Sequence, residues 1–305
     1  MPPALADVAI LGGGPAGMQA ALVLARTRKR VIVFDRPEPP RNAASHGVHN
    51  FLGLDGLRPS EIRERAWTQI GVYGAGELRS ESVGEVSRPE PGGPFAIDTD
   101  AGTITARHVV LACGFEDVVP SIEGFDECWG KTIFSCPFCD GYENRDRLWG
   151  IVPASADYLD FLPEMSQNWT SRRLVIAQPG IHVSADRQRA ISALGVPVHR
   201  GRIVEIHHDD GNVGAIVLDG GEQVTVEALH WTLEERVLEV VRSAERSVGL
   251  GLDDEGHVIA DEFGRTNVPR LWAAGDVRGW AGAIDAAAAG GAVAHMIVRE
   301  WFAGG

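Results

Sequence analysis

The chain has 305 residues, of which 44% are hydrophobic and 23% charged, and its formal net charge is −14. This length suits two domains, or one domain with an insertion, and the acidic balance argues against nucleic acid or an anionic membrane as a partner. Ala6–Gly14 has the pattern of a strand leading into a glycine turn, unlike a signal peptide, and no apolar run is long enough to span a bilayer. We therefore expect a cytoplasmic location.

The N-terminal residues carry a dinucleotide-binding pattern. Asp7–Leu11 is an apolar strand, and the following GGGPAG opens a helix that is predicted to run to about Arg28. Gly12 would permit the tight turn, Gly14 would let the backbone approach a pyrophosphate, and Gly17 would pack the helix on the strand. Unpaired N–H groups at the start of the helix would then face the phosphates.

A second apolar strand, Val31–Phe34, ends in Asp35. An acid roughly 20 residues after the glycines is where a ribose hydroxyl is usually bound. Strand, turn, helix, second strand and acid together indicate a dinucleotide site, whose predicted residues are Gly12, Gly14, Pro15, Ala16, Gly17 and Asp35.

Two later segments favour FAD over a nicotinamide nucleotide at this site. His108–Gly114 (HVVLACG) and Thr266–Asp276 (TNVPRLWAAGD) are predicted strands, and an alanine- and glycine-rich helix follows from about Ala283. Both segments resemble the later FAD fingerprints of flavoproteins with two dinucleotide-binding domains. The resemblance implies that Asp276 binds the ribityl–phosphate region and that the helix N-terminus faces the flavin ring, where its dipole stabilises negative charge. The cofactor-binding residues added on this basis are Gly114, Gly275, Asp276, Ala283 and Ile284.

Within these flavoproteins the chain resembles the low-molecular-weight thioredoxin reductases over nearly its whole length. HNFLG, which begins at His49, resembles the segment beside the flavin, with Asn50 as the implied contact, and CPFCDG, which begins at Cys136, resembles the redox motif. The implied fold is α/β, with two Rossmann-like, three-layer ββα dinucleotide-binding domains, the second inserted into the first. Residues 1–118 and 238–305 would bind FAD, and residues 119–237 would carry the cysteines. The resemblance also implies a homodimer.

Of the four cysteines, only Cys136 and Cys139 are close in sequence. CxxC spacing lets two sulfurs meet across one helical turn, and a helix starting there would make Cys136 the more reactive thiolate. The resemblance implies that Cys139 faces the flavin, that Cys136 meets the substrate, and that Asp140 is the general acid. Cys113 and Cys128 are expected only to pack.

A zinc site would need a second cysteine pair, or histidines at metal-ligand spacing, after the CPFC motif. Neither follows in the sequence, so we expect no metal. His46 and His49 precede the motif in the segment that would pass the flavin, and either could act as a base for a dithiol. A histidine bound to loop backbone is the alternative interpretation. The predicted catalytic residues are Cys136, Cys139, Asp140 and His49.

The expected nicotinamide site of the inserted domain is degenerate. Gly150 is present, but Val152 and Pro153 stand where the glycine turn should open, and Pro153 removes one N–H donor. Arg172 and Arg173 precede the next strand, and we interpret them as solvated charges rather than as a site for a ribose phosphate. Such loss resembles the dithiol oxidases of the gliotoxin and holomycin type, and also the ferredoxin-dependent thioredoxin reductases.

Three hypotheses remain open on the sequence. The preferred one is an FAD-dependent dithiol oxidase that passes electrons from a small-molecule dithiol through the cysteines to oxygen. The second is a disulfide reductase with a thioredoxin-like partner, fed by ferredoxin or by an atypical NAD(P)H site. The third is a flavin redox sensor without turnover. Asp140 stands where the dithiol oxidases commonly have histidine, which weakens a direct assignment to them.

Overall fold

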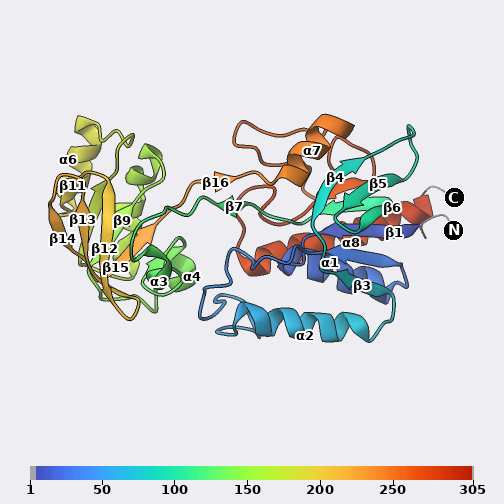
Figure 1. The fold of residues 1–305 in the computed structure, drawn as a ribbon, viewed down its shortest axis with the longest axis horizontal. Helices are drawn as coiled ribbons and strands as arrows, with labels where there is room; N and C mark the ends of the chain where they lie inside the picture. The colour runs from blue at the N-terminus through green and yellow to red at the C-terminus, as the bar shows by residue number, and fades with distance from the viewer. Residues whose placement is uncertain (1–4, 304–305) are drawn as a thin grey trace. The chain divides into compact units, whose positions relative to one another are not determined.

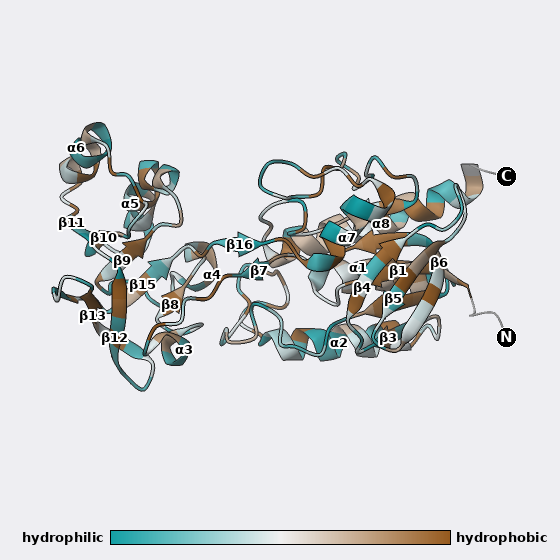
Figure 2. Ribbon diagram, turned by 45° about the horizontal axis from the view of Figure 1, so that its top comes forward, coloured by the Kyte–Doolittle hydropathy of each residue, from teal (hydrophilic) through white to brown (hydrophobic). Residues whose placement is uncertain are grey.

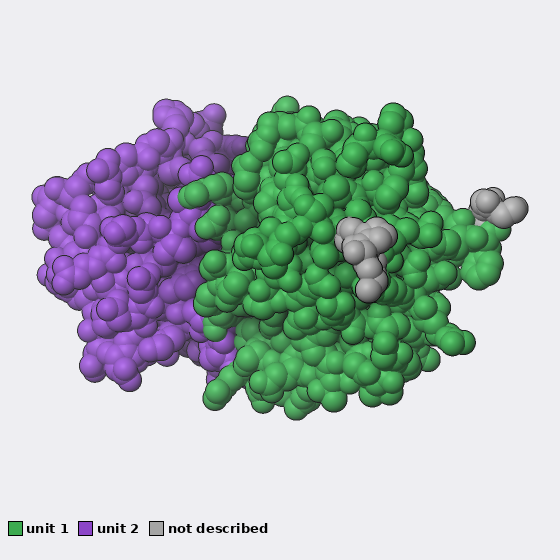
Figure 3. Space-filling model, turned by 45° about the vertical axis from the view of Figure 1, so that its right-hand side comes forward, with its two compact units in different colours: residues 1–43, 50–116, 236–305 green, residues 44–49, 117–235 purple. Residues whose placement is uncertain are grey.

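The computed structural model describes residues 5–303, which divide into two compact units (Figure 3). The first unit comprises the chain up to Ala43, Asn50–Glu116, and the chain from Arg236 onward. The second comprises Asp117–Glu235 together with the short segment Ala44–His49. The boundaries lie two residues before the positions expected from the sequence, and the separate placement of 44–49 was not foreseen.

The first unit is built on a seven-stranded sheet of order β3-β2-β1-β6-β5-β4, with β17 also pairing β6 (Figure 1). Strands β3, β2, β1, β6 and β17 are parallel to one another. Strands β5 and β4 extend the sheet beyond β6 in antiparallel pairing. The strands are β1 (Ala6–Leu11), β2 (Val31–Phe34), β3 (Gly76–Arg79), β4 (Val83–Ser87), β5 (Phe95–Thr99), β6 (Gly102–Leu111) and β17 (Leu271–Ala273).

Alternate residues of β1 enter two different cores, as the twofold period of a strand requires. Val8 and Ile10 pack with the helices α1 and α8, whereas Ala9 packs with the β4–β5 side and with α7. Strand β1 is mostly hydrophobic (Figure 2), and β2 is buried at all of its positions. Burial on both faces makes this a three-layer unit. Its helices are α1 (Pro15–Arg26), α2 (Pro59–Gly71), α7 (Glu239–Val248) and α8 (Ala283–Ala303).

Two expected elements of the first unit are shorter than the sequence pattern indicated. Helix α1 ends at Arg26, and Arg28 has a φ of +63°, outside the helical region. Of Thr266–Asp276, only Leu271–Ala273 is strand, because Arg270 has a φ of +69° and the Thr266 side chain bonds the Leu271 backbone across a turn. Residues 112–114 likewise follow β6 instead of extending it.

The second unit has a five-stranded parallel sheet of order β11-β10-β9-β15-β8 and a three-stranded antiparallel sheet of order β12-β13-β14. Its parallel strands are β8 (Ile133–Phe134), β9 (Trp149–Val152), β10 (Arg173–Ala177), β11 (Val198–Arg200) and β15 (Ala228–Trp231). The antiparallel strands are β12 (Ile203–Asp209), β13 (Asn212–Leu218) and β14 (Gln223–Thr225).

Helical segments of the second unit are short. They are α3 (Phe125–Cys128), α4 (Pro137–Asp140), the 3₁₀ turn η1 (Ala156–Asp160), α5 (Leu162–Met165), the 3₁₀ turn η2 (Ser166–Asn168) and α6 (Ala185–Ala193). Where the chain passes between the units, β7 (Glu116–Asp117) pairs with β16 (Glu235–Arg236). Among the described residues, no helix combines the length and apolar character needed to cross a membrane.

Candidate active site

The glycine turn after β1 has the geometry that a bound pyrophosphate needs. Gly12 has a φ of +110°, and a Cβ there would lie 2.3 Å from the Ala112 carbonyl oxygen. A Cβ on Gly17 would lie 1.9 Å from the Gly12 carbonyl oxygen, so each position admits only glycine. A Cβ on Gly14 would meet nothing within 4 Å, and Gly14 caps α1 without a side-chain hydrogen bond. The first turn of α1 therefore offers N–H groups to open space, which fits a phosphate.

Asp35 lies at the end of β2 and is fixed against this turn. Its Oδ1 accepts the Gly13 N–H at 3.0 Å, and its Oδ2 pairs with the guanidinium of Arg63. Arg63, on α2, also donates to the Gly13 carbonyl at 2.9 Å. The sequence did not indicate Arg63, because nothing in its spacing links α2 to the turn. The carboxylate is thus held in a fixed orientation beside the glycine turn, and its role in binding a ribose stays a prediction.

The remaining FAD fingerprints meet at the same sheet edge. A Cβ on Gly114 would lie 3.8 Å from the Asp276 Cβ, and one on Gly275 would lie 3.0 Å from the Ala16 Cβ. Arg41 reaches Asp276 with an Nη1–Oδ2 distance of 3.5 Å. The predicted cofactor residues therefore lie at the carboxyl ends of neighbouring strands. The glycine turn follows β1, Asp35 follows β2, Gly114 lies after β6, and Gly275 and Asp276 lie after β17. Pro15 and Ala16 are in the first turn of α1.

The other predicted cofactor residues lie in two further places of the first unit. Asn50 has a φ of +59° and donates its backbone N–H to Asp55 Oδ1 at 2.8 Å. Ala283 and Ile284 begin α8, and the Ile284 side chain is partly exposed. The open cradle at Gly14 and the oriented carboxylates fit an adenine dinucleotide such as FAD.

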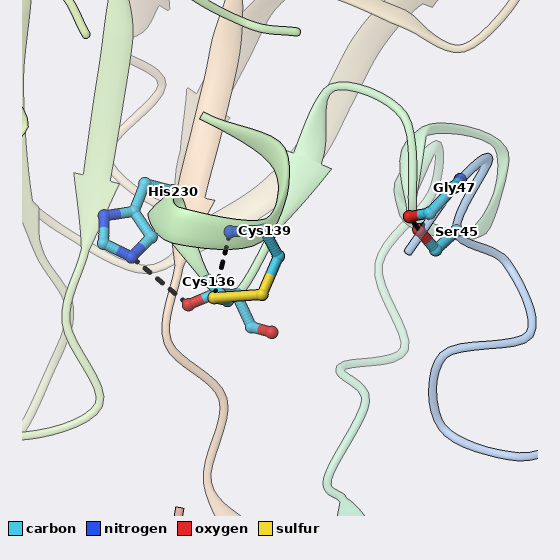
Figure 4. The surroundings of a disulfide bond; sticks show 6 residues. Ser45, Gly47, Cys136, Cys139 and His230 are labelled. Atoms are coloured by element: carbon cyan, nitrogen blue, oxygen red, sulfur yellow. Dashed lines mark hydrogen bonds between the residues drawn. A yellow bond between two sulfur atoms is a disulfide. The ribbon is translucent and has the colours of Figure 1, made fainter. Parts of the chain in front are cut away.

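In the second unit, Cys136 and Cys139 form a disulfide with a Cα–Cα distance of 5.2 Å (Figure 4). Cys136 caps the N-terminus of α4, and its sulfur accepts the Cys139 N–H at 3.2 Å. Pro137 follows at the first helical position, where a missing N–H has no cost. After reduction, the same N–H remains available to stabilise a thiolate on Cys136.

The two other cysteines have free thiols. Burial raises the pKa of Cys113 to about 12 and the pKa of Cys128 to about 11. Neither is therefore a ready thiolate near neutral pH, in agreement with the packing role expected of them.

Asp140 ends α4 directly after Cys139. Burial, the largest effect, raises the pKa of its carboxyl to about 6, and Glu143 raises it further, whereas His46 and His49 lower it. Its Oδ1 is buried and has no hydrogen-bond partner. A carboxyl with a pKa in this range exchanges protons close to neutral pH, as an acid–base group beside a thiol must.

The segment Ala44–His49 belongs to the second unit and supplies both histidines. His46 Nδ1 lies 3.2 Å from the Gly130 carbonyl oxygen, and His49 Nε2 lies 3.6 Å from Glu143 Oε1. A Cβ on Gly130 would lie 2.5 Å from the Ala44 carbonyl oxygen, so the segment packs tightly there. His46 thus contacts a loop backbone carbonyl, which was the alternative to a role as a base, and His49 is paired with the carboxylate of Glu143. Glu143 was missed, although it lies only three residues after Asp140.

Aromatic side chains support the cysteine helix. Trp169 packs edge-on against Phe138 at 5.3 Å between ring centroids and is stacked on Trp149 at 6.1 Å. His230, on β15, points its Nε2 at the Ser135 carbonyl oxygen, 3.3 Å away (Figure 4). Burial lowers the pKa of His230 to about 4, so its ring is neutral. These contacts hold the backbone on either side of Cys136, and the sequence did not indicate His230.

The turn after β9 differs from a phosphate-binding turn. Pro153 is buried, and the Ala154 N–H donates to Thr232 Oγ1 at 2.7 Å. The 3₁₀ turn η1 follows instead of a long helix, and it carries Asp157 and Asp160. Arg187, on α6, pairs with each of these carboxylates at 2.7 Å. The Ala154 N–H and the Arg187 guanidinium are therefore bound within the protein, and the turn places two carboxylates where a phosphate would need positive charge.

Arg173 corrects one expectation from the sequence. It was interpreted as a solvated charge, but it begins β10 and is 8% exposed. Its guanidinium donates to the Pro163 carbonyl at 2.7 Å and to the Thr170 carbonyl at 3.2 Å, so backbone oxygens compensate its burial. Arg172 is half exposed and pairs with Glu227 at 2.8 Å, as a surface charge would.

Comparison with known proteins identifies the family. Residues 6–149 and 171–291 match the family described as pyridine nucleotide-disulphide oxidoreductase, and the chain belongs to it. It is 27% identical to the thioredoxin reductase aclD of Aspergillus oryzae, over 89% of this chain and 88% of that protein. It is 35% identical to a probable thioredoxin reductase of Arthroderma benhamiae, but this alignment covers 52% of the chain and only 40% of that relative.

Solved structures share the fold. The crystal structure of HlmI is similar with a TM-score of 0.89 and 30% identity, over 97% of this chain and 92% of that one. The prediction of a two-domain α/β fold of thioredoxin reductase type is thereby confirmed, and so is FAD as the cofactor. The roles predicted for single residues stay predictions.

Proposed function

We propose that the protein is an FAD-dependent dithiol oxidase that forms a disulfide in its substrate through Cys136 and Cys139 without a nicotinamide nucleotide. One observation carries the proposal: the turn after β9 has a buried proline, a committed N–H and two carboxylates where a nucleotide phosphate would bind. The redox pair of the same unit is complete. On this proposal, the first unit binds FAD and the second is a degenerate nicotinamide-type domain that carries the cysteines.

The thiol chemistry is a pair of exchange steps. A substrate thiolate attacks the Cys136 sulfur, a substrate–Cys136 disulfide forms, and Cys139 leaves as a thiolate. The second thiolate of the substrate then attacks the substrate sulfur of that mixed disulfide. This step closes the disulfide within the substrate and releases Cys136 as a thiolate. Two electrons have passed to the cysteines, and FAD, when bound, supplies the acceptor that restores their disulfide, with dioxygen as the expected oxidant. The Cys139 N–H stabilises the thiolate on Cys136 in the second step.

Two groups are proposed to handle the protons of this exchange. Each substrate thiol must lose a proton before it attacks, and His49, paired with Glu143, is the proposed base for this step. Asp140 is proposed to exchange a proton with Cys139, because the carboxyl directly follows that residue and has a pKa of about 6. The base and the acid thus come from different segments of the chain.

A disulfide reductase is the second candidate, and two observations favour it. The relatives reported above are described as thioredoxin reductases. Phe138 and Tyr142, which flank the second cysteine, are 55% and 65% exposed and could contact a thioredoxin-like protein. In this candidate, electrons flow the opposite way and enter from ferredoxin or an atypical NAD(P)H site. The expected homodimer and cytoplasmic location stay predictions under both candidates.

Anaerobic mixing separates the two directions. The flavin absorbance of the purified protein is followed after adding NADPH, NADH or a dithiol such as dithiothreitol. No bleaching with either nucleotide, bleaching with the dithiol, and dithiol-dependent hydrogen peroxide once air is admitted would support the oxidase. Prompt bleaching with NADPH or NADH would refute it and establish a reductase. Slow reoxidation of the dithiol-reduced flavin by air, with little hydrogen peroxide, would also refute it and favour a reductase fed by ferredoxin.

A further inference from the structure

We propose that His46, His49 and Glu143 form a binding site for a divalent cation of the zinc class, separate from the sulfur ligands of the cysteine pair. Each residue offers one ligand atom, and the three atoms lie within 4.8 Å of one another. Two imidazoles and one carboxylate suit zinc, and three protein ligands leave a fourth position for water. Among residues 5–303, this is the one cluster of three such side chains.

The distances require little rearrangement. Zinc bonds of about 2.0–2.1 Å place neighbouring ligand atoms of a tetrahedron roughly 3.3 Å apart. His49 Nε2 and Glu143 Oε1 are already 3.6 Å apart. The rings of His46 and His49 have centroids 6.1 Å apart and are inclined by 57°. His46 is exposed, so its ring can close the remaining gap by a small rotation.

The backbone prepares His46 as a ligand. Its Nδ1 lies 3.2 Å from the Gly130 carbonyl oxygen, which accepts only if Nδ1 carries the proton. That tautomer leaves the Nε2 lone pair for a metal, and metal-binding histidines typically donate their other N–H to such a partner. The close packing of Ala44 on Gly130 keeps the segment in this position.

Two buried carboxylate oxygens without hydrogen-bond donors give the cation an electrostatic reason to bind. Glu143 Oε2 is buried without a hydrogen-bond partner, and the same holds for Oδ1 of the neighbouring Asp140. Buried carboxylate oxygens without a donor are costly, and a divalent cation beside them removes that cost. The sequence did not show this site because both histidines precede the cysteine motif by about ninety residues.

The test uses the oxidised, FAD-containing protein, freed of metal with a chelator that is then removed, and Zn²⁺ alone as the probe. Isothermal titration calorimetry should show one equivalent of Zn²⁺ bound per chain. Replacement H46A, H49A or E143Q should each weaken binding on the order of 100-fold, because a ligand is worth at least as much as its supporting partners. Absence of binding, or binding unchanged in all three variants, would overturn the proposal.

Two controls separate this site from other zinc ligands. His199 forms a pair with Glu222 at 2.8 Å in the same unit but has no second histidine, so H199A should leave binding unchanged. The double replacement of Cys136 and Cys139 by serine should also retain the site, and loss of binding there would assign the ion to sulfur and refute the inference. Flavin content and melting temperature of each variant report its folding. Zn²⁺ bound to His49 would occupy the lone pair that a base needs, so the base role proposed for His49 belongs to the metal-free protein. None of these readouts depends on the direction of electron flow.

Discussion

The buried carboxyl of Asp140 makes a quantitative prediction about stability. Its pKa is about 6 in the folded protein, whereas the ordinary value is 3.8. The folded state therefore holds the proton more tightly than the unfolded state, so stability falls as pH rises from about 4 through about 6. At pH 7.5, ionisation at this site costs up to about 3 kcal/mol, from 1.36 kcal/mol per pKa unit. Below about pH 3 both states are protonated and the cost vanishes.

Replacement D140N removes the charge but keeps the shape of the side chain. We expect the variant to be more stable than the parent by about 2–3 kcal/mol at pH 7.5 and by nearly nothing at about pH 3. Proton transfer should fail at the same time, so turnover with a dithiol should fall about 10²-fold or more. Urea unfolding of the oxidised protein at several pH values, with a chelator present, measures the difference in free energy.

The matched control is D209N, because Asp209 is an exposed aspartate of the same unit. Its effect should stay within about 0.5 kcal/mol at every pH. A D140N variant that is less stable at pH 7.5, or equally stabilised at both pH values, would refute the assignment of burial as the cause of the raised pKa.

Three further predictions follow from single contacts. Replacement C139S should lower dithiol-dependent flavin bleaching on the order of 10³-fold or more while leaving bound flavin in place, and full activity would refute the proposed electron path. Replacement G12A should abolish flavin binding, because the added Cβ has no room at a φ of +110°, and absorbance of the purified protein reports this directly. Replacement R173M should lower the free energy of unfolding in urea by about 3 kcal/mol, because it leaves the buried carbonyls of Pro163 and Thr170 without their donor. Replacement R172M should lower it by under about 0.5 kcal/mol, because this arginine is exposed. Equal losses in the two variants would contradict the difference in burial.

The fold and the glycine turn could be predicted because their signals are contiguous. Strand, turn and helix at Gly12–Gly17 follow one another directly, and Asp35 ends the next strand. Arg63 could not be found this way, because its contact with Asp35 exists only once α2 packs beside the turn. A tertiary contact of this kind leaves no periodic mark in the chain.

The same distinction holds in the second unit. Cys136 and Cys139 are a local motif, and their disulfide needs only one helical turn. Arg173 was misjudged because a charge in sequence gives no hint of the backbone oxygens that will surround it. The pairing of His49 with Glu143 was likewise missed, since about ninety residues separate them and nothing in the spacing predicts the packing of Ala44 on Gly130.

The turn after β9 also bears on how such a domain could evolve or be engineered. Replacing Pro153 by glycine alone would leave the Ala154 N–H bound to Thr232. Removing that hydrogen bond as well would still leave Asp157 and Asp160 in the turn, each paired with Arg187. Each single change therefore gains nothing for a nucleotide while it removes a contact that now holds the turn together. On the proposed function, several substitutions would therefore be needed together before this turn could bind a nucleotide phosphate.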